Sequence, residues 1–506
     1  KSKSTVWSIR SFSPEEVDKL APTDSLHPWA KRYSFSAPKG SGLHWDYVHP
    51  TTGFLFNSAY PFGGNDGVIW AGKGLTSFAQ AGIAMRWGVL SAKLAPVAFR
   101  SENLSFSLMD NGRIGPLRFA DGQLALAVDK PQRFGDLPYS RLDLGESTIR
   151  IDAGPFATGL STASQWWGPT SEYPYILGNN AGGFPHLFVG TAHPVGVKIG
   201  TVHARVVYGS LAQSPYSSVT GNDYFESYTN PGKVRFMAGL VGVVQINRIN
   251  GLELGGGRFF HAASAQTRFT GSNVRLPFQN FLKSRIRAES DTVFGDDRSL
   301  QQNQLASAFF RWAPPGTGVE LYGEYGREDF SADLRDLFLE PDHSATLNGG
   351  FRKAWSYGTS MNAVRAEIFT YEAPAGTRNR GEGLIYLHLP LAQGHTQRGQ
   401  ILGAPVGVGS GSAQMIAFER YTPGGKMKTF LSRVTQREHS LVEQAYLSGE
   451  PFTKGVDVMN SIGAEMSRFL GPFDISGKVV FTDNLNRYFN SDVSNLNVGL
   501  TVRQSF

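Results

Sequence analysis

Segments in which apolar and polar residues alternate recur along this chain of 506 residues. In 234–247, for example, apolar side chains occupy one side, and Arg235, Gln245 and Asn247 occupy the other. A period of two indicates a β-strand with one apolar and one polar face. The same alternation is found at 198–208, 319–325, 363–371, 382–389, 462–469 and 473–482. Most of these runs reach about 8–13 residues, which is longer than usual for soluble strands and close to the length of a tilted membrane strand.

The sequence ends on another run of this kind, "NLNVGLTVRQSF". Its apolar side consists of Leu496, Val498, Leu500, Val502 and Phe506. Because an unmatched backbone N–H in lipid costs several kcal/mol, a barrel must pair its last strand with its first. We therefore predict that this segment is the closing strand. It also resembles the C-terminal assembly signal of bacterial outer-membrane barrels, which implies the barrel assembly machinery as a partner through the strand ending in Phe506.

Two folds compete for this pattern, because the apolar face could meet either the core of a soluble sandwich or the lipid around a membrane barrel. The mean hydropathy of −0.23 fits both, since a barrel with a polar lumen also has an unremarkable average. The barrel is favoured because strand candidates follow one another without helical crossovers. It is also favoured by aromatic residues near strand ends, as expected at membrane interfaces. These are Tyr208, Trp312, Tyr325, Tyr371 and Phe469.

The predicted fold is therefore all-β: a transmembrane, antiparallel, up-and-down β-barrel with a plug or periplasmic segment. Roughly 18 strand-like runs can be counted, with 16 as the alternative number. Short helices are expected at 13–20, which has a capping box, and at 333–340. We predict a periplasmic N-terminal segment at 1–32, containing the first helix, and a barrel with long loops at 33–506.

The composition and the motifs exclude several kinds of chemistry. The chain has no cysteine, which excludes thiolate catalysis, zinc bound by cysteine, and disulfides. The formal charge is +6, but Lys and Arg are scattered among acidic residues, so nucleic acid is not an expected partner. Neither a G-x-S-x-G nor an H-E-x-x-H motif occurs. We therefore predict neither enzymatic activity nor a bound metal or cofactor.

Charged residues on the polar face of the strands are predicted to face the lumen. They are Glu320, Glu324, Arg365, Glu367, Glu382, His388 and Lys478. Paired carboxylates could form an acid–base couple. The favoured interpretation is a lumen network, in which opposite charges offset one another's desolvation.

Aromatic residues with amide neighbours are concentrated at 161–190, which includes Trp166, Trp167, Asn179 and Asn180. Aromatic rings stack on the C–H faces of sugars, and amides pair with hydroxyl groups, so this stretch could bind a glycan. Alternatively, its tryptophans could anchor the membrane interface.

At this stretch the sequence resembles the capsule-assembly Wzi family of outer-membrane proteins. The likeness is carried by 165–191, 321–355, 384–410 and the terminal strand. The resemblance implies an 18-stranded outer-membrane barrel that acts as a lectin for capsular or extracellular polysaccharide. It also assigns motif positions for glycan binding or loop organisation. These are Trp166, Trp167, Asn179, Asn180, Glu324, Arg327, Asp329, Asp336 and His343.

The predicted function is therefore the binding of surface polysaccharide by a protein of the cell outer membrane, with membrane lipid and lipopolysaccharide as further partners. An open porin for small polar solutes is the alternative, and an outer-membrane hydrolase is a third hypothesis. The last rests on the inward carboxylates and His388 alone.

Overall fold

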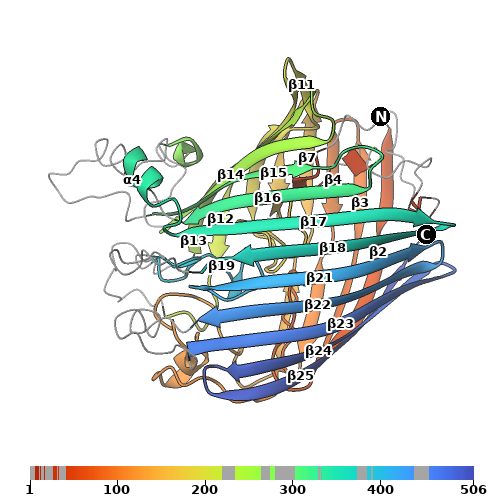
Figure 1. Ribbon diagram of the computed structural model, residues 1–506. Coiled ribbons are helices and arrows are strands. Elements are labelled where there is room, and N and C mark those ends of the chain that lie inside the picture. Colours follow the sequence, from red (N-terminus) through yellow and green to blue (C-terminus); the bar gives the residue numbers. More distant parts are fainter. Residues whose placement is uncertain are drawn as a thin grey trace.

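The structure, a computed structural model, describes most of the chain in separate ranges. These are residues 6–10, 12, 16–17, 27–30, 32–33, 42–218, 234–263, 274–279, 302–328, 331, 333–372, 384–388, 391–437 and 455–505. Within them, strands dominate and close into one antiparallel barrel of 18 strands (Figure 1). The predicted fold class and the higher of the two strand counts are confirmed.

The wall begins and ends on neighbouring strands. In chain order its elements are β2 (Leu43–Asn57), β3 (Gly74–Trp87), β4 (Leu90–Leu94), β5 (Val97–Ser101), β6 (Tyr139–Asp143), β7 (Thr148–Ala153), β8 (Phe156–Ser161), β10 (His186–Thr191), β11 (Val195–Val197), β12 (Gly200–Ala212), β13 (Val234–Ile246), β14 (Leu252–Ala263), β15 (Gln302–Trp312), β16 (Val319–Glu328), β17 (Ala345–Tyr357), β18 (Ser360–Thr370), β21 (Gly411–Thr422), β22 (Gly425–Arg437), β23 (Val456–Leu470), β24 (Phe473–Arg487) and β25 (Ser491–Gln504). Three wall positions are each made of two short segments, namely β4 with β5, β6 with β7, and β10 with β11.

The last strand closes the barrel as predicted. β25 pairs with β24 on one side and with β2 on the other, in a register that runs from Thr51↔Arg503 to Asn57↔Asn497. On the lumen side of this seam, the Asn497 amide donates to Asn57 Oδ1 at 2.8 Å, and Asn495 donates to the same oxygen at 3.3 Å. Phe506 lies outside the described residues.

The outer face of the wall is an apolar belt. Ile416, Leu431, Ile462, Phe481 and Leu496 are register neighbours on five successive strands, β21 to β25. Their side chains are between 39% and 59% exposed. A continuous row of exposed aliphatic and aromatic residues around a barrel is the surface that contacts the hydrocarbon of a membrane. The alternation in sequence therefore corresponds to an apolar exterior and a polar lumen.

The two ends of the barrel differ in the length of their connections. At one end, β17 and β18, β21 and β22, and β23 and β24 are joined by tight turns, whereas the connections at the other end include 102–138, 162–185 and 371–410. Outer-membrane barrels carry short turns on the periplasmic side and long loops outside the cell. We call these the turn end and the loop end.

Helices are short in the described part of the chain. They are η1 (Gly115–Phe119), η3 (Leu276–Phe278) and α4 (Leu334–Leu339), and α4 confirms the helix expected at 333–340. Residues 16 and 17 are helical, but most of the helix expected at 13–20 lies outside the described residues. None of the described helices combines the length and the apolar character needed to cross a membrane.

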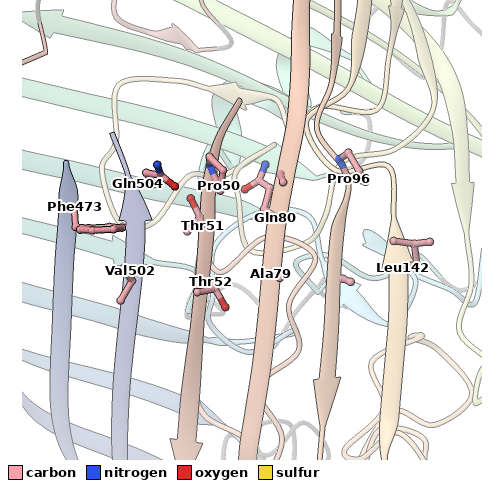
Figure 2. Close-up of a pocket in the computed structure, with 12 residues that line it drawn as sticks. Pro50, Thr51, Thr52, Ala79, Gln80, Pro96, Leu142, Phe473, Val502 and Gln504 are labelled. Atoms are coloured by element: carbon pink, nitrogen blue, oxygen red, sulfur yellow. The ribbon is translucent and has the colours of Figure 1, made fainter. Parts of the chain in front are cut away.

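Proline shapes one side of the wall. Pro50 lies in a β-bulge of β2, between Val48 and Thr51, and Pro96 separates β4 from β5. Both positions follow from the missing N–H of proline, which cannot join a strand ladder. Between them the wall has a shallow hollow of about 460 Å³, lined mainly by apolar side chains that include Ala79, Leu142 and Val502 (Figure 2). Because exposed Leu142 belongs to the outer face, this hollow is separate from the packed lumen described below.

Candidate functional site

The N-terminal segment enters the lumen. β1 (Ile9–Arg10) pairs with β9 (Trp166–Trp167) as a two-stranded ribbon inside the barrel. Glu253, which points inward from β14, accepts hydrogen bonds from Trp7 N at 3.0 Å, Ser8 N at 3.2 Å and Ser8 Oγ at 2.7 Å. Its carboxylate also lies 3.2 Å from Arg311 Nη1. One wall carboxylate therefore binds the backbone of the incoming segment.

Residues 27–30 and 32–33 lie at the turn end instead. Trp29 Nε1 donates to the carbonyl of Thr422 at 3.0 Å, and Arg32 Nε donates to Asp474 at 2.9 Å. The division of the chain into a segment 1–32 and a barrel 33–506 stays a prediction.

A second interior segment, 162–185, is bound by Glu367 of β18. This carboxylate is fully buried and accepts hydrogen bonds from three consecutive backbone amides, Ser171 N at 2.8 Å, Glu172 N at 3.0 Å and Tyr173 N at 2.7 Å. The hydroxyl of Tyr322 donates to Oε2 of the same carboxylate, which also accepts from Ser171 N. Since buried amides need acceptors and a buried carboxylate needs donors, each group removes the desolvation cost of the other.

A third interior segment, 384–410, packs against the second. The Tyr386 hydroxyl donates to the carbonyl of Tyr175 at 2.7 Å, and His395 Nε2 lies 2.6 Å from the carbonyl of Ile176. Arg235, a fully buried side chain on β13, donates to the carbonyls of Gly394 and Thr396. This segment also contains the short ribbon of β19 (Thr396–Gln397) and β20 (Gln400–Ile401).

At the loop end, the connection 102–138 is joined to these interior parts through Asp129. Its backbone N–H donates to the carbonyl of Gln393 at 2.9 Å, and its carboxylate accepts from Ser214 N at 2.6 Å. Burial raises the pKa of this carboxyl above its ordinary value, although the Ser214 hydrogen bonds act in the opposite direction.

Together the interior segments form a core inside the barrel. Ile9, Trp167, Ile176, Tyr386 and Leu402 belong to one cluster of buried side chains, which also includes inward residues of the wall. An open polar lumen would be filled with water, whereas this lumen is filled with packed apolar side chains from three segments. We conclude that the described residues plug the barrel.

Apart from His388, the charged residues predicted to face the lumen do so wherever the structure describes them. Glu320 bonds Arg311 at 2.6 Å, Arg365 bonds Glu172 of the second segment at 2.6 Å, and Lys478 lies 3.9 Å from Asp66. Glu324 is buried against Gly168. Glu382 lies outside the described residues.

One predicted strand is wrong. Residues 384–388 of the run 382–389 are not part of the wall but belong to the third interior segment. Ile385 and Tyr386 are consecutive and both buried, so each face of this run contacts protein. His388 is accordingly a residue of the plug, not of a wall strand.

Two of the five aromatic residues predicted to lie at the membrane interfaces do not face the lipid. Tyr371, which is 2% exposed, and Phe469 point into the barrel; Phe469 packs against Trp29 and Tyr33. Outward Ile368 and Ile462, which are 57% and 59% exposed, fix the orientation of these strands. Their spacing already places 371 and 469 on the lumen side, so alternation could have found both.

The residues singled out for glycan binding do not form one site. Trp166 and Trp167 lie in the lumen ribbon, and Trp167 is 1% exposed. Asn179 donates to the carbonyl of Asn65 at 3.0 Å, and Asn180 donates to the carbonyl of Ile401 at 2.9 Å. In this structure all four hold interior segments together.

Of the remaining candidates, Glu324 points into the lumen, whereas Arg327, Asp336 and His343 lie on the outer face of β16 and in the loop that follows it. Arg327 follows outward-facing Leu321 and Tyr325 on β16, so its side chain points away from the lumen. Its Nη1 contacts the carbonyl of Glu340 at 3.4 Å, next to α4, which carries Asp336 and precedes His343. Asp329 lies outside the described residues. Alternation on β16 predicts the outward direction of Arg327, whereas the folding of the following loop against it has no sequence signal.

Sequence reasoning missed Glu253, Arg235 and Asp129, whose contacts hold the interior segments. Among the described residues there is no group of three or more His, Asp or Glu side chains that could hold a metal ion.

Taken together, the apolar belt, the closed wall and the packed interior define a plugged β-barrel of the outer membrane. A family model described as capsule assembly protein Wzi matches residues 62–450. The chain therefore belongs to the Wzi capsule assembly family.

One solved structure supports the same fold. The chain is similar to a structure of Escherichia coli Wzi, described as an outer-membrane protein involved in group 1 capsule assembly and as a carbohydrate-binding β-barrel. The sequence identity is 15%, the match covers 99% of this chain and 95% of the other, and the TM-score is 0.63. Acinetobacter baumannii OccAB3 is 10% identical, with 91% and 99% coverage and a TM-score of 0.43. A BenF-like porin from Pseudomonas fluorescens Pf-5 has the same identity and coverage, with a TM-score of 0.40. No curated protein matches the chain.

We expect Glu253→Ala to release the N-terminal segment. Hydrogen bonds to a charged acceptor contribute roughly 1.5–3 kcal/mol each, so losing three should raise the population of the displaced segment about a thousandfold or more. Limited proteolysis of the folded barrel should then cut near residues 6–10 much faster than in the wild type. Glu320→Ala is the matched control, because Glu320 also pairs with Arg311 and interacts with the segment through the charge of Arg10, but accepts no hydrogen bond from the described backbone of residues 6–10. Equal cleavage in both variants would contradict the role of Glu253.

Proposed function

We propose that this protein binds capsular or other extracellular polysaccharide at the loop end of its barrel and retains it at the cell surface. The observation that carries the proposal is the family match, which runs over residues 62–450 and so includes most of the wall, two interior segments and several long loops. The carbohydrate-binding description of the Escherichia coli structure supports it.

The packed interior favours this function over an open porin. Diffusion of polar solutes needs a continuous aqueous path, and three described segments occupy the lumen with buried apolar side chains. We propose that a single barrel with its plug in place passes no steady current.

We propose a division of labour among the candidate residues. Trp166, Trp167, Asn179 and Asn180 organise the plug, as their contacts with protein atoms suggest. Asp336 and His343 beside α4 remain candidates for glycan contact, because carboxylate and imidazole groups pair with sugar hydroxyls. Arg327, near the end of β16, contacts this loop at the carbonyl of Glu340, and Asp329 follows β16 in the sequence.

The other predicted partners belong to this proposal as well. Membrane lipid and lipopolysaccharide would surround the apolar belt, and the barrel assembly machinery would recognise the strand that ends in Phe506. We propose no catalytic role for the inward carboxylates. Glu320 and Glu367 are already engaged by Arg311 and by backbone amides, and Glu324→Gln should leave polysaccharide binding unchanged.

The test is a glycan array of bacterial surface polysaccharides, probed with the detergent-solubilised protein. We expect the wild type to bind at least one polysaccharide. The double variant Asp336→Ala, His343→Ala should weaken that binding at least about tenfold, or 1.4 kcal/mol. Asp342→Ala, an exposed acidic change in the same loop, is the matched control and should bind as the wild type does. Failure of the wild type to bind any polysaccharide would refute the function, whereas an unchanged double variant would refute only the site.

A further inference from the structure

Two loop elements are attached to the outer face of the wall. Residues 274–279, which contain η3, are bound by Tyr208, whose hydroxyl donates to the carbonyl of Val274 at 2.8 Å. Arg258 donates to the carbonyl of Gln279 at 2.6 Å. Arg258 alternates with inward Glu253 and His261, so it points outward and away from the lumen. Leu276 completes a small buried cluster with outward-facing side chains of β12, β13 and β14.

The loop of α4 is attached in the same way. The Tyr325 hydroxyl donates to the carbonyl of Pro341, and Arg327 contacts the carbonyl of Glu340 at 3.4 Å. Tyr325 is the register neighbour of Leu347, an outward residue of β17 that is 56% exposed. In Figure 1, α4 lies to the left of β12–β17, beyond the ends of these strands.

The two tyrosines fix the depth of these loops relative to the membrane. Tyrosine on the outer face of a barrel, next to the apolar belt, lies at the level of the lipid headgroups, with its ring toward hydrocarbon and its hydroxyl toward polar groups. Here both hydroxyls are bonded to loop carbonyls. The loops must therefore occupy headgroup depth beside the wall.

At that depth the loops present bare apolar side chains. Phe278 is 63% exposed, and on α4 Leu334, Phe338 and Leu339 are 57%, 80% and 63% exposed. Moving a large apolar side chain out of water is favourable by roughly 1.5–3 kcal/mol, and a side chain that stays in water does not gain this free energy. The apolar region of the outer leaflet begins directly beside them, continuous with the belt at Leu347.

We propose that η3 and α4 form an interfacial anchor, which inserts Phe278, Leu334, Phe338 and Leu339 into the outer leaflet of the membrane. Exposed Arg275 lies next to η3 and can pair with lipid phosphates, whereas on α4 the charge of Arg335 is offset by Asp333 and Asp336, so the apolar side chains carry the insertion there. The anchor gives one flank of the barrel a contact with lipid beyond its wall strands. It depends on the membrane placement of the barrel, and its test does not involve polysaccharide.

The absence of cysteine makes the test direct. Single variants Phe278→Cys and Phe338→Cys are spin-labelled in phosphatidylethanolamine–phosphatidylglycerol vesicles, and the accessibility of each label to oxygen and to a water-soluble nickel complex is measured. Leu431→Cys, in the middle of the belt, is the lipid reference. Ile114→Cys is the aqueous reference, because Ile114 is 91% exposed on the connection 102–138.

We expect the labels at 278 and 338 to favour oxygen over nickel several-fold more than the label at 114, approaching the label at 431. The anchor would be overturned if the labels at 278 and 338 had the same ratio of oxygen to nickel accessibility as the label at 114, while the label at 431 remained lipid-like. Dipolar broadening between labels at high lipid dilution would also overturn it, because a second copy of the chain would then cover the surface. A water-like label at 431 would instead refute the membrane barrel itself.

Discussion

Replacing Glu367 with alanine should loosen the plug and allow ions through the barrel. The substitution removes the acceptor of three consecutive amides, the buried amide of Tyr173 and the half-buried amides of Ser171 and Glu172. Leaving a buried donor without an acceptor costs roughly 1–3 kcal/mol, so the Tyr173 amide alone makes holding the second segment in place less favourable by about that amount. In planar bilayers we expect brief conductance steps from the variant and a closed barrel from the wild type.

The matched control for this experiment is Glu465→Ala. Glu465 is also an inward carboxylate, but its recorded partner is Lys428 of the neighbouring wall strand, at 3.0 Å. Its loss should leave the barrel closed. Glu367→Gln keeps one acceptor oxygen, so its conductance should be intermediate between those of the wild type and Glu367→Ala. This variant replaces Glu367→Ala in the experiment if the alanine variant does not assemble. A wild type that conducts steadily would refute the plug, and a closed Glu367→Ala barrel would refute its dependence on this carboxylate.

The wall was predictable because lipid imposes a strict period of two. On β13, the residues expected to share the apolar face, such as Leu240 and Val244, do face outward, and Arg235 faces inward. The closing role of the last strand followed from the same rule, since hydrocarbon leaves no backbone group unpaired.

The interior was not predictable from the same pattern. The run at 382–389 alternates as a wall strand does, but Ile385 in it is buried against protein, and alternation does not reveal which medium touches an apolar face. The contacts of Glu253 and Glu367 join residues that are far apart in the chain, Glu253 with Ser8 and Glu367 with Tyr173. Such pairs depend on the closed barrel and leave no local signal.

The candidate site divides for a related reason. Trp166 and Arg327 occur in motifs that resemble the same family, yet they lie on opposite sides of the wall. Family motifs mix residues that maintain the plug with residues at the loop end, because substitution of either kind damages the same protein. Only the geometry separates the two roles, and it moves the search for glycan contacts from the tryptophans to the loop of α4.

Leu431→Arg should strongly destabilise the barrel, because Leu431 is at the centre of β22 and its register neighbours Ile416 and Ile462 are equally apolar. Arginine on the lipid face costs roughly 2–4 kcal/mol at the midplane of a bilayer and about 0–1 kcal/mol near its interfaces. The free energy of unfolding, measured by denaturant titration in lipid vesicles, should therefore fall by roughly 2–4 kcal/mol.

Leu470→Arg makes the same change at the end of β23, next to a tight turn, where the leucine is as exposed as Leu431, 58% against 55%. This variant should lower the free energy of unfolding by only about 0–1 kcal/mol, the cost at an interface position. If hydrocarbon were not the medium around this wall, depth along the barrel would not matter, and the two exposed leucines would tolerate arginine equally well. A difference of roughly 1–4 kcal/mol between the variants is therefore the specific expectation of a membrane-embedded wall.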